Sequence, residues 1–271
     1  MFRPPVNKPR VKPSAPRTSY LDQSNISSVT LKSPLVKKQL LILDLNGTLV
    51  SRLKPTTALY ARPYHDIFFD YIFENFNVMV WSSAQPQNVN NMCRIFDKHR
   101  NKLRLIWDRT KFGLSTKEYN SKTVTIKNLE RVWKKLPEFG PTDTILLDDS
   151  PEKTILQPHN HCVVSEFDHK SPEFKTHGDC ELMLVKAYLE KIQHQDNVSN
   201  YIKNHPYVSS PIGANGKEER PEEEGDSPVA LPSTICYHYV FPKHGGDPPL
   251  PTSCDLGVAD ELTSKVDRLK L

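Results

Sequence analysis

Acidic and hydroxyl side chains come directly after three short apolar runs of this sequence. Asp44 follows the run LLIL, and Ser82 follows VMVW. Two adjacent carboxylates, Asp148 and Asp149, follow the run ILL. Adjacent carboxylates repel one another unless a cation or another partner compensates them, and oxygen ligands of this kind suit a hard cation such as Mg²⁺. These residue types predict a site that handles phosphate or metal.

The residues beside these acids also allow two simpler interpretations. Gly47 permits a tight turn after Asp44, and Thr48 can hydrogen-bond back to the carboxylate or to a ligand, but an Asn-Gly turn after a strand is also ordinary. The stretch Asp148-Asp149-Ser-Pro-Glu is likewise typical of a helix start. A helix cap needs only one carboxylate, so the doubled pair favours a metal site.

Strand-like and helix-like patterns alternate along the middle of the chain. Apolar runs predict strands at residues 40–43, 77–82, 103–108, 144–148 and 162–166. Amphipathic stretches predict helices at residues 64–75, 86–99, 127–136 and 179–194. This alternation predicts an α/β fold with a doubly wound parallel sheet. Parallel strands present their carboxyl ends at one edge, where open α/β sheets bind ligands, so the acids should meet there.

Both ends of the chain differ in composition from its middle. The 271 residues are 37% hydrophobic and 25% charged, which is enough for one ordinary core. Residues 1–37 form a basic, proline-rich arm, and residues 206–271 are proline-rich with an acidic stretch. Neither end can bury enough apolar surface to order itself. We therefore expect one domain at 38–205 between disordered tails, with one short extended piece at 235–241.

Composition also restricts the class of protein. Five cysteines without a CxxC pair fit a reducing compartment and offer no zinc framework. No apolar run approaches the roughly 18 to 20 residues that a membrane helix requires. A net charge of +4 is too small to predict a nucleic-acid binder, beyond weak contacts of the basic arm. We expect a soluble monomer in the nucleus or cytoplasm, without a membrane partner.

Four short motifs occur in order along the predicted domain. They are DLNGT at 44–48, Ser82 in VWSSA, Lys127 in TIKNL, and LLDDSPEK. Together with an Arg-Pro pair after the first motif, they resemble the haloacid dehalogenase superfamily. Within it they resemble the RNA-polymerase C-terminal-domain phosphatases of the FCP/SCP-like branch, also called the NLI-interacting-factor-like domain. The resemblance covers residues 38–195 and implies a Rossmann-like (HAD-like) fold without a large cap domain.

The resemblance implies a Mg²⁺-dependent phosphatase that acts through an aspartyl-phosphate intermediate. Asp44 would be the nucleophile. Mg²⁺ would bind Asp44, Asp149 and the main-chain oxygen of Asn46, and it would neutralise the approach of two anionic groups. Asp148 would orient the catalytic lysine or hold a metal-bound water.

The resemblance also implies a phosphate-binding set. Thr48, Ser82 and Lys127 would hold the phosphate oxygens as charge redistributes during the reaction. Lys122 and Lys153 are alternatives to Lys127, which on its own could equally be an exposed helix lysine. Ser82 is preferred to the serine that follows it by alignment with the motif alone.

One residue departs from the family pattern. The second aspartate of the DxDxT motif, which protonates the leaving oxygen and later activates water, is Asn46 here. An amide carries no exchangeable acid proton at neutral pH, and loss of a general acid/base typically slows a reaction by ~10² to 10⁴-fold. Two functions stay open: a Ser/Thr protein phosphatase weakened by Asn46, and a phosphopeptide-binding or scaffold member of the family.

The spacing of the first two motifs bears on the substrate. Only 37 residues separate Asp44 from Ser82, which leaves residues 50–61 as a short flap. An open site suits a large substrate such as a phosphorylated protein. Residues 107–123 predict either an extra hairpin or loop beside the groove, or a solvated connector. The sequence HNH at 159–161 has the spacing of a chelate, but we favour a surface turn.

Overall fold

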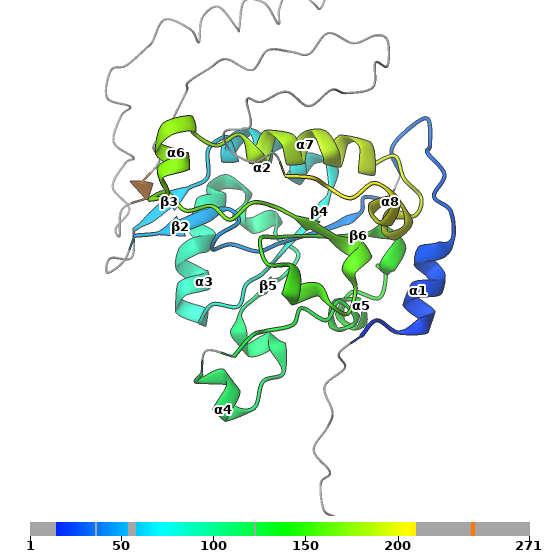
Figure 1. The fold of residues 1–271 in the computed structure, drawn as a ribbon, viewed down its shortest axis with the longest axis horizontal. Helices are drawn as coiled ribbons and strands as arrows, with labels where there is room; N and C mark the ends of the chain where they lie inside the picture. Colours follow the sequence, from blue (N-terminus) through cyan, green and yellow to red (C-terminus); the bar gives the residue numbers. More distant parts are fainter. Residues whose placement is uncertain (1–14, 36, 54–57, 122, 210–239, 242–271) are drawn as a thin grey trace, which may run out of the picture.

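A five-stranded parallel sheet forms the centre of the computed structural model, which describes residues 15–35, 37–53, 58–121, 123–209 and 240–241 (Figure 1). The strand order is β5-β4-β1-β6-β7. The strands are β1 (Leu40–Leu43), β4 (Asn77–Trp81), β5 (Ile106–Trp107), β6 (Thr144–Asp148) and β7 (His161–Val163). The predicted α/β fold is confirmed, and each predicted strand is present, although β5 and β7 are shorter than their apolar runs.

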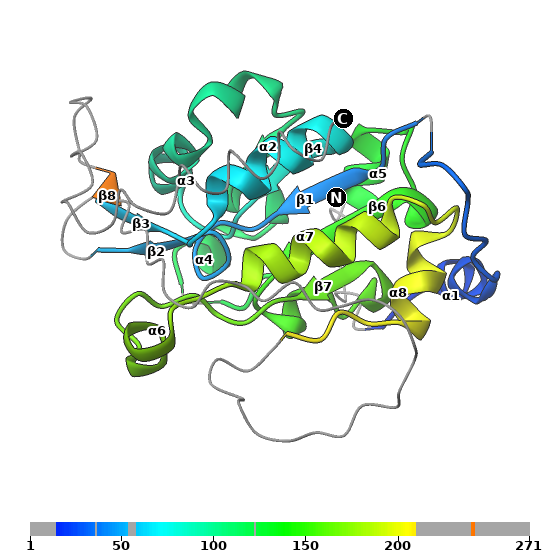
Figure 2. The same ribbon diagram turned by 90° about the horizontal axis from the view of Figure 1, so that it is seen from above.

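Helices cover both faces of this sheet, as expected of a doubly wound fold. They include α2 (His65–Asn75), α3 (Pro86–Met92), α5 (Glu130–Lys135), α7 (Glu181–Ile192) and α8 (Val198–Asn204). Alternate side chains of β1 point to opposite faces. Leu41 and Leu43 join a buried cluster with residues of α2 and α7, which lie on one face (Figure 2). Leu40 and Ile42 join a second cluster with residues of α5.

The register of the strands places the predicted acids side by side. Leu43 of β1 is level with Leu147 of β6, and the N–H of Asp44 donates to the main-chain oxygen of Leu147 at 2.9 Å. Leu43 is also level with Val80 of β4. The residues that follow β1, β4 and β6 therefore share one edge of the sheet.

Two predicted helices have other boundaries in the structure. The prediction at 86–99 divides into α3 and the 3-10 segment η1 (Cys93–Lys102), and within η1 Asp97 has a φ of 37°. A non-glycine residue at positive φ interrupts a regular helix. Helix α5 begins only at Glu130, so Lys127 lies on the loop before it.

The predicted disordered arm at 1–37 is corrected in part. It contains helix α1 (Thr18–Asn25), which packs against α8. Tyr20 is only 3% exposed, and its ring stacks on His159 with the ring centroids 6.1 Å apart. The average composition of the arm concealed this one buried aromatic residue. Residues 1–14 lie outside the described residues.

The predicted flap is an antiparallel hairpin of β2 (Val50–Arg52) and β3 (Leu59–Ala61). Between Asp44 and Ser82 the described residues add only helix α2 and strand β4, and no cap domain. A short strand, β8 (Val240–Phe241), pairs with β3 at its outer edge. These two residues belong to the piece predicted as extended; the rest of that piece and of the C-terminal tail beyond residue 209 lies outside the described residues.

The segment at 107–123 does not form a hairpin. Its described residues include the 3-10 segment η2 (Arg109–Phe112) and helix α4 (Thr116–Tyr119). The Arg109 guanidinium donates to three main-chain oxygens in and just after α4, at 2.8 to 3.0 Å. This segment is therefore a connector folded onto one arginine.

The described helices and cysteines carry little further information on location. Within the described ranges, no helix is both long enough and apolar enough to cross a membrane. Cys93 and Cys162 are buried, Cys180 is exposed, and none of these three is in a disulfide.

Candidate active site

Three carboxylates meet at the carboxyl edge of the sheet. Asp44 follows β1, Asp148 ends β6, and Asp149 comes next in the chain. One oxygen of each lies within 4.8 Å of the others, and no other group of three potential metal ligands occurs in the described part of the chain. We call these three residues the aspartate cluster. The parallel pairing of β1 with β6 produces it, because the two strands end at the same level.

Lys127 lies between two members of the aspartate cluster. Its Nζ donates to Oδ1 of Asp44 at 2.9 Å and to Oδ2 of Asp148 at 2.5 Å, and its side chain is fully buried. The main chain holds it in place, since the N–H of Lys127 donates to the main-chain oxygen of Lys153 at 2.7 Å. Lys127 therefore bridges two of the three predicted site acids.

Lys153 enters the same cluster from the 3-10 segment η4 (Pro151–Thr154). Its Nζ lies 2.9 Å from Oδ1 of Asp148, 3.8 Å from Oδ2 of Asp44 and 3.9 Å from Oδ1 of Asp149. The sequence predicted this lysine only as an alternative to Lys127. The structure places both lysines in the site, while Lys122 lies outside the described residues.

Burial and the two lysines act in opposite directions on the carboxylates. Burial raises the pKa of Asp148, but Lys127 and Lys153 outweigh it and lower that pKa to about 2. Burial raises the pKa of Asp149 to about 6, against the attraction of Lys153. Burial also raises the pKa of Asp44, and Lys127 opposes that effect. Asp148 is therefore the firmly ionised member of the cluster.

The donor set of the aspartate cluster fits a hard divalent cation. Carboxylate oxygens are the ligands that Mg²⁺ prefers, usually one or two carboxylates together with waters and substrate phosphate. Asp149 is the cluster member nearest to solvent, with a side chain that is 13% exposed, whereas Asp44 and Asp148 are almost fully buried. Asp149 therefore forms the side of the cluster that is nearest to solvent.

The turn after Asp44 requires glycine at position 47. Gly47 has a φ of +88°, and a Cβ added there would lie 2.8 Å from Oδ2 of Asp149. The neighbouring Thr48 donates from Oγ1 to Oδ1 of Asp149 at 3.2 Å. The turn thus packs directly onto the aspartate cluster. The predicted phosphate ligand Thr48 contacts an acid of the cluster and is fully buried.

Asn46 faces the flap. Its Oδ1 accepts a hydrogen bond from Nε of Arg52 in β2 at 3.0 Å. The pattern of the strand gives no sign that the Arg52 side chain turns back to the turn at 44–48, so this contact could not be found from the sequence. In the family that the motifs resemble, this position carries a general acid. Here it is occupied by an amide whose oxygen accepts a hydrogen bond from the Arg52 guanidinium.

The Arg-Pro pair supplies a buried support for the same turn. The Arg62 guanidinium is fully buried; it donates to both carboxylate oxygens of Asp179 and to the main-chain oxygen of Thr48 at 3.0 Å. It also donates to the main-chain oxygen of Ser165. Arg62 thereby ties the turn at 44–48 to the segment before α7. Its partner Asp179 is 117 residues away and could not be identified from the motif.

Ser82 lies where the strand pattern places it. It follows β4, is 1% exposed, and its N–H donates to the main-chain oxygen of Trp107 at 2.9 Å. Its Oγ accepts from the N–H of Ala84 at 3.4 Å. This serine shares the sheet edge with Asp44, on the neighbouring strand.

His161 is not part of a surface turn, contrary to the favoured prediction for HNH. It is 5% exposed on β7, where its Nε2 hydrogen-bonds the main-chain oxygen of Asp148 at 3.0 Å. Its Nδ1 pairs with Oγ1 of Thr154 at 2.8 Å. The alternating pattern of a short strand turns it inward, while His159 stacks on Tyr20. The two histidines therefore form no chelate.

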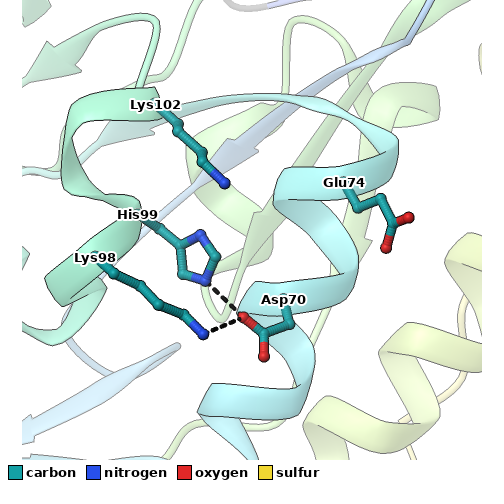
Figure 3. Close-up of a pocket in the computed structure, with 5 residues that line it drawn as sticks. All are labelled: Asp70, Glu74, Lys98, His99 and Lys102. Atoms are coloured by element: carbon teal, nitrogen blue, oxygen red, sulfur yellow. Dashed lines mark hydrogen bonds and ion pairs between the residues drawn. The ribbon is translucent and has the colours of Figure 1, made fainter.

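A separate cleft of about 510 Å³ lies between α2 and η1 (Figure 3). It is lined by Asp70, Glu74, Lys98, His99 and Lys102. Asp70 accepts from Lys98 and from His99, at 2.9 and 2.7 Å. Asp70 is thus already compensated by two neighbours, and the elements that line the cleft contribute nothing to the aspartate cluster.

The part of the chain that matches known proteins contains the residues of this site. Residues 39–199 match the NLI interacting factor-like phosphatase family. An uncharacterised FCP1 homology domain-containing protein of Schizosaccharomyces pombe is 34% identical over 212 residues, which cover 71% of this chain and 85% of that protein. Ubiquitin-like domain-containing CTD phosphatase 1 of Drosophila melanogaster is 25% identical, over 60% of this chain.

The match with the fly protein spans 52% of its length, so about half of that relative has no counterpart in the alignment. Among solved structures, the RNA polymerase II CTD phosphatase Fcp1 superposes with a TM-score of 0.49 at 13% identity, covering 62% of this chain and 70% of that one.

Proposed function

The chain belongs to the NLI interacting factor-like phosphatase family, and from that premise we propose that it is a Mg²⁺-dependent phosphatase of phosphoserine and phosphothreonine in proteins. The observation that carries this proposal is the bonding of Lys127 to both Asp44 and Asp148 in a buried site. A nucleophilic carboxylate needs a cation beside it when it approaches a phosphate dianion, and this arrangement supplies one.

In the proposed reaction, a carboxylate oxygen of Asp44 attacks phosphorus while the bond to the serine or threonine oxygen breaks, and the departing oxygen takes its proton from water because Asn46 has none to give. Water then attacks the aspartyl-phosphate, releases inorganic phosphate and restores the Asp44 carboxylate. Lys127 already contacts Asp44 and would hold a phosphate oxygen as negative charge redistributes. Ser82, at the same edge of the sheet, would donate to a second phosphate oxygen.

Asp44, Asp149 and the main-chain oxygen of Asn46 would hold Mg²⁺, with Asp148 reaching it through a water. The bound ion would supply positive charge at the phosphate. Thr48 would orient Asp149 within this set of ligands, because its hydroxyl donates to that carboxylate. Its predicted role as a phosphate ligand is thereby replaced by a proposed role in orienting a metal ligand.

The pair of Asn46 and Arg52 favours a second candidate function, a phosphopeptide-binding or scaffold protein with slow turnover. Asn46 cannot protonate the leaving oxygen, and its own oxygen is already bound to Arg52. Leaving groups that need no proton would still depart, so we expect aryl phosphates to be cleaved faster than phosphoserine.

The flap supports a protein substrate. The hairpin of β2 and β3 is short, and the described residues contain no cap domain that would enclose a small metabolite. The fly relative is named a CTD phosphatase, which agrees with a phosphorylated protein as substrate. We extend this class of substrate, and a nuclear or cytoplasmic setting, to the present chain as part of the proposal.

Hydrolysis of an aryl phosphate with MgCl₂ tests the proposal. The full chain should turn over, Asp44→Asn should lose all turnover, and Lys127→Met should lose most of it. Binding of a phosphoserine peptide, measured by fluorescence anisotropy, separates the two candidates. A wild type that binds the peptide but hydrolyses no phosphate ester would reject the phosphatase and support the binding module.

A further inference from the structure

The aspartate cluster contains two cations of its own. Three carboxylates and two ammonium groups leave one negative charge when all five are ionised. Lys127 is fully enclosed between Asp44 and Asp148. Lys153 is different, because its Nζ lies within 4 Å of one oxygen from each of the three aspartates.

Lys153 also lies at the open side of the cluster. Its side chain is 13% exposed, as is that of Asp149, whereas Lys127, Asp44 and Asp148 are 2% exposed or less. Only one of its three carboxylate neighbours is at hydrogen-bond distance, namely Asp148 at 2.9 Å. The other two are separated from Nζ by 3.8 and 3.9 Å, so this contact set can be exchanged without unpacking the core.

The charge of Lys153 persists in this position. Its Nζ lies within 4 Å of three carboxylates, and opposite charges at this distance favour the charged form of an ammonium group. A lysine ammonium is a compact charge on a flexible stem, so it can turn from one set of oxygens to another. A divalent cation held by the same carboxylates would repel it.

We propose that Lys153 is a displaceable counter-ion, which shares the aspartate cluster with Mg²⁺, lowers the affinity for that ion, and turns to the phosphate when both are bound. This inference rests on the proposed function. It assigns to Lys153 a role that differs from that of Lys127, whose enclosed ammonium stays between Asp44 and Asp148.

Coupled binding follows from this proposal. Phosphate gives the Lys153 ammonium a new anionic partner and so removes its competition with Mg²⁺. Coupling between two ligands is reciprocal and typically amounts to about 5- to 150-fold in affinity. Mg²⁺ and inorganic phosphate should therefore each tighten the binding of the other, and the effect should depend on Lys153.

Calorimetric titration of the full chain with MgCl₂ tests the proposal without any measurement of turnover. We expect Lys153→Gln to bind Mg²⁺ on the order of tenfold more tightly than wild type. Lys153→Arg keeps the charge and should bind Mg²⁺ as wild type does. Lys134→Gln, on the exposed side of α5, is the matched control and should not differ from wild type. Lys153→Met serves as a second neutral variant if Lys153→Gln does not fold.

The titration is then repeated with inorganic phosphate present. Phosphate should tighten Mg²⁺ binding to wild type on the order of tenfold, and by much less in Lys153→Gln. Equal Mg²⁺ affinities of wild type and the neutral variants overturn the proposal, as does a complete lack of Mg²⁺ binding. A wild type that shows these differences but hydrolyses no phosphate ester rejects the proposed enzyme and supports the counter-ion role of Lys153.

Discussion

Nε of Arg52 donates to Oδ1 of Asn46 at 3.0 Å, which joins the flap to the turn at 44–48 at the position where the family pattern carries an acid. An arginine at this distance would also pair with a carboxylate in place of the amide. The contact would therefore affect the pKa of an aspartate introduced at position 46.

Asn46→Asp alone should improve turnover of phosphoserine only weakly. Arg52 would favour the ionised carboxylate and lower its pKa, which leaves little acid to protonate the leaving oxygen. Asn46→Asp combined with Arg52→Gln should raise the rate for this poor leaving group on the order of 10²-fold or more. Arg52→Gln alone is the control. Steady-state kinetics on a phosphoserine peptide and an aryl phosphate measure these rates. An equal gain from Asn46→Asp alone and from the double variant would contradict the role of Arg52.

Gly47→Ala should destabilise the fold and disturb the aspartate cluster. The residue has a φ of +88°, and the added Cβ would meet Asp149 at 2.8 Å, so we expect a loss of about 1 to 3 kcal/mol in unfolding free energy. Mg²⁺ affinity should fall as well. Gly140→Ala is the matched control. Gly140 has a negative φ, and a Cβ added there would meet no atom within 4 Å. Urea denaturation measures the unfolding free energy of the two variants, and calorimetric titration measures their Mg²⁺ affinity. Equal losses of stability in Gly47→Ala and Gly140→Ala would contradict the strain at Gly47.

Loss of one partner of the Arg62–Asp179 pair should be costly. Both side chains are 1% exposed or less, so Asp179→Ala leaves a buried guanidinium uncompensated, and we expect a loss of about 3 to 5 kcal/mol. The exposed pair of Arg104 and Glu138 offers a comparison, and Glu138→Ala should cost less than about 1 kcal/mol. Denaturant unfolding of the two variants would decide the matter. Similar losses in both would show that burial of the pair has no such effect.

The free energy of unfolding should decrease as the pH is lowered, because His161 is buried in the folded protein. Burial lowers its pKa from 6.5 to about 4, so the folded protein holds it neutral. Its contribution is complete above pH 6.5 and is lost as pH falls from 6.5 toward 4, because the unfolded chain binds the extra proton in that range. The expected loss is about 2 kcal/mol at pH 5.

His161→Gln should flatten this pH dependence, and His177→Gln, at an exposed position, should leave it unchanged. Urea unfolding at pH 7.5 and at pH 5 compares the three proteins. A slope that is the same in wild type and His161→Gln would exclude His161 as its source.

The sequence by itself determined the sheet and the placing of its acids. The apolar runs before Asp44, Ser82 and Asp148 predicted strands, and parallel strands end at one edge whatever their loops are. The order of the motifs predicted the family, which the match of residues 39–199 confirms. These features are local patterns of hydrophobicity and residue type, and they need no knowledge of distant contacts.

The tertiary structure alone decided which distant side chains meet. Lys153 joins Lys127 in one cluster, Arg52 reaches Asn46, Arg62 pairs with Asp179, and Tyr20 orders part of an arm that composition assigned to disorder. No periodicity encodes such contacts, because each depends on the path of intervening chain and on the direction in which a long side chain leaves its element. Burial and charge then set their electrostatics, because Lys127 and Lys153 hold the pKa of the buried Asp148 at about 2.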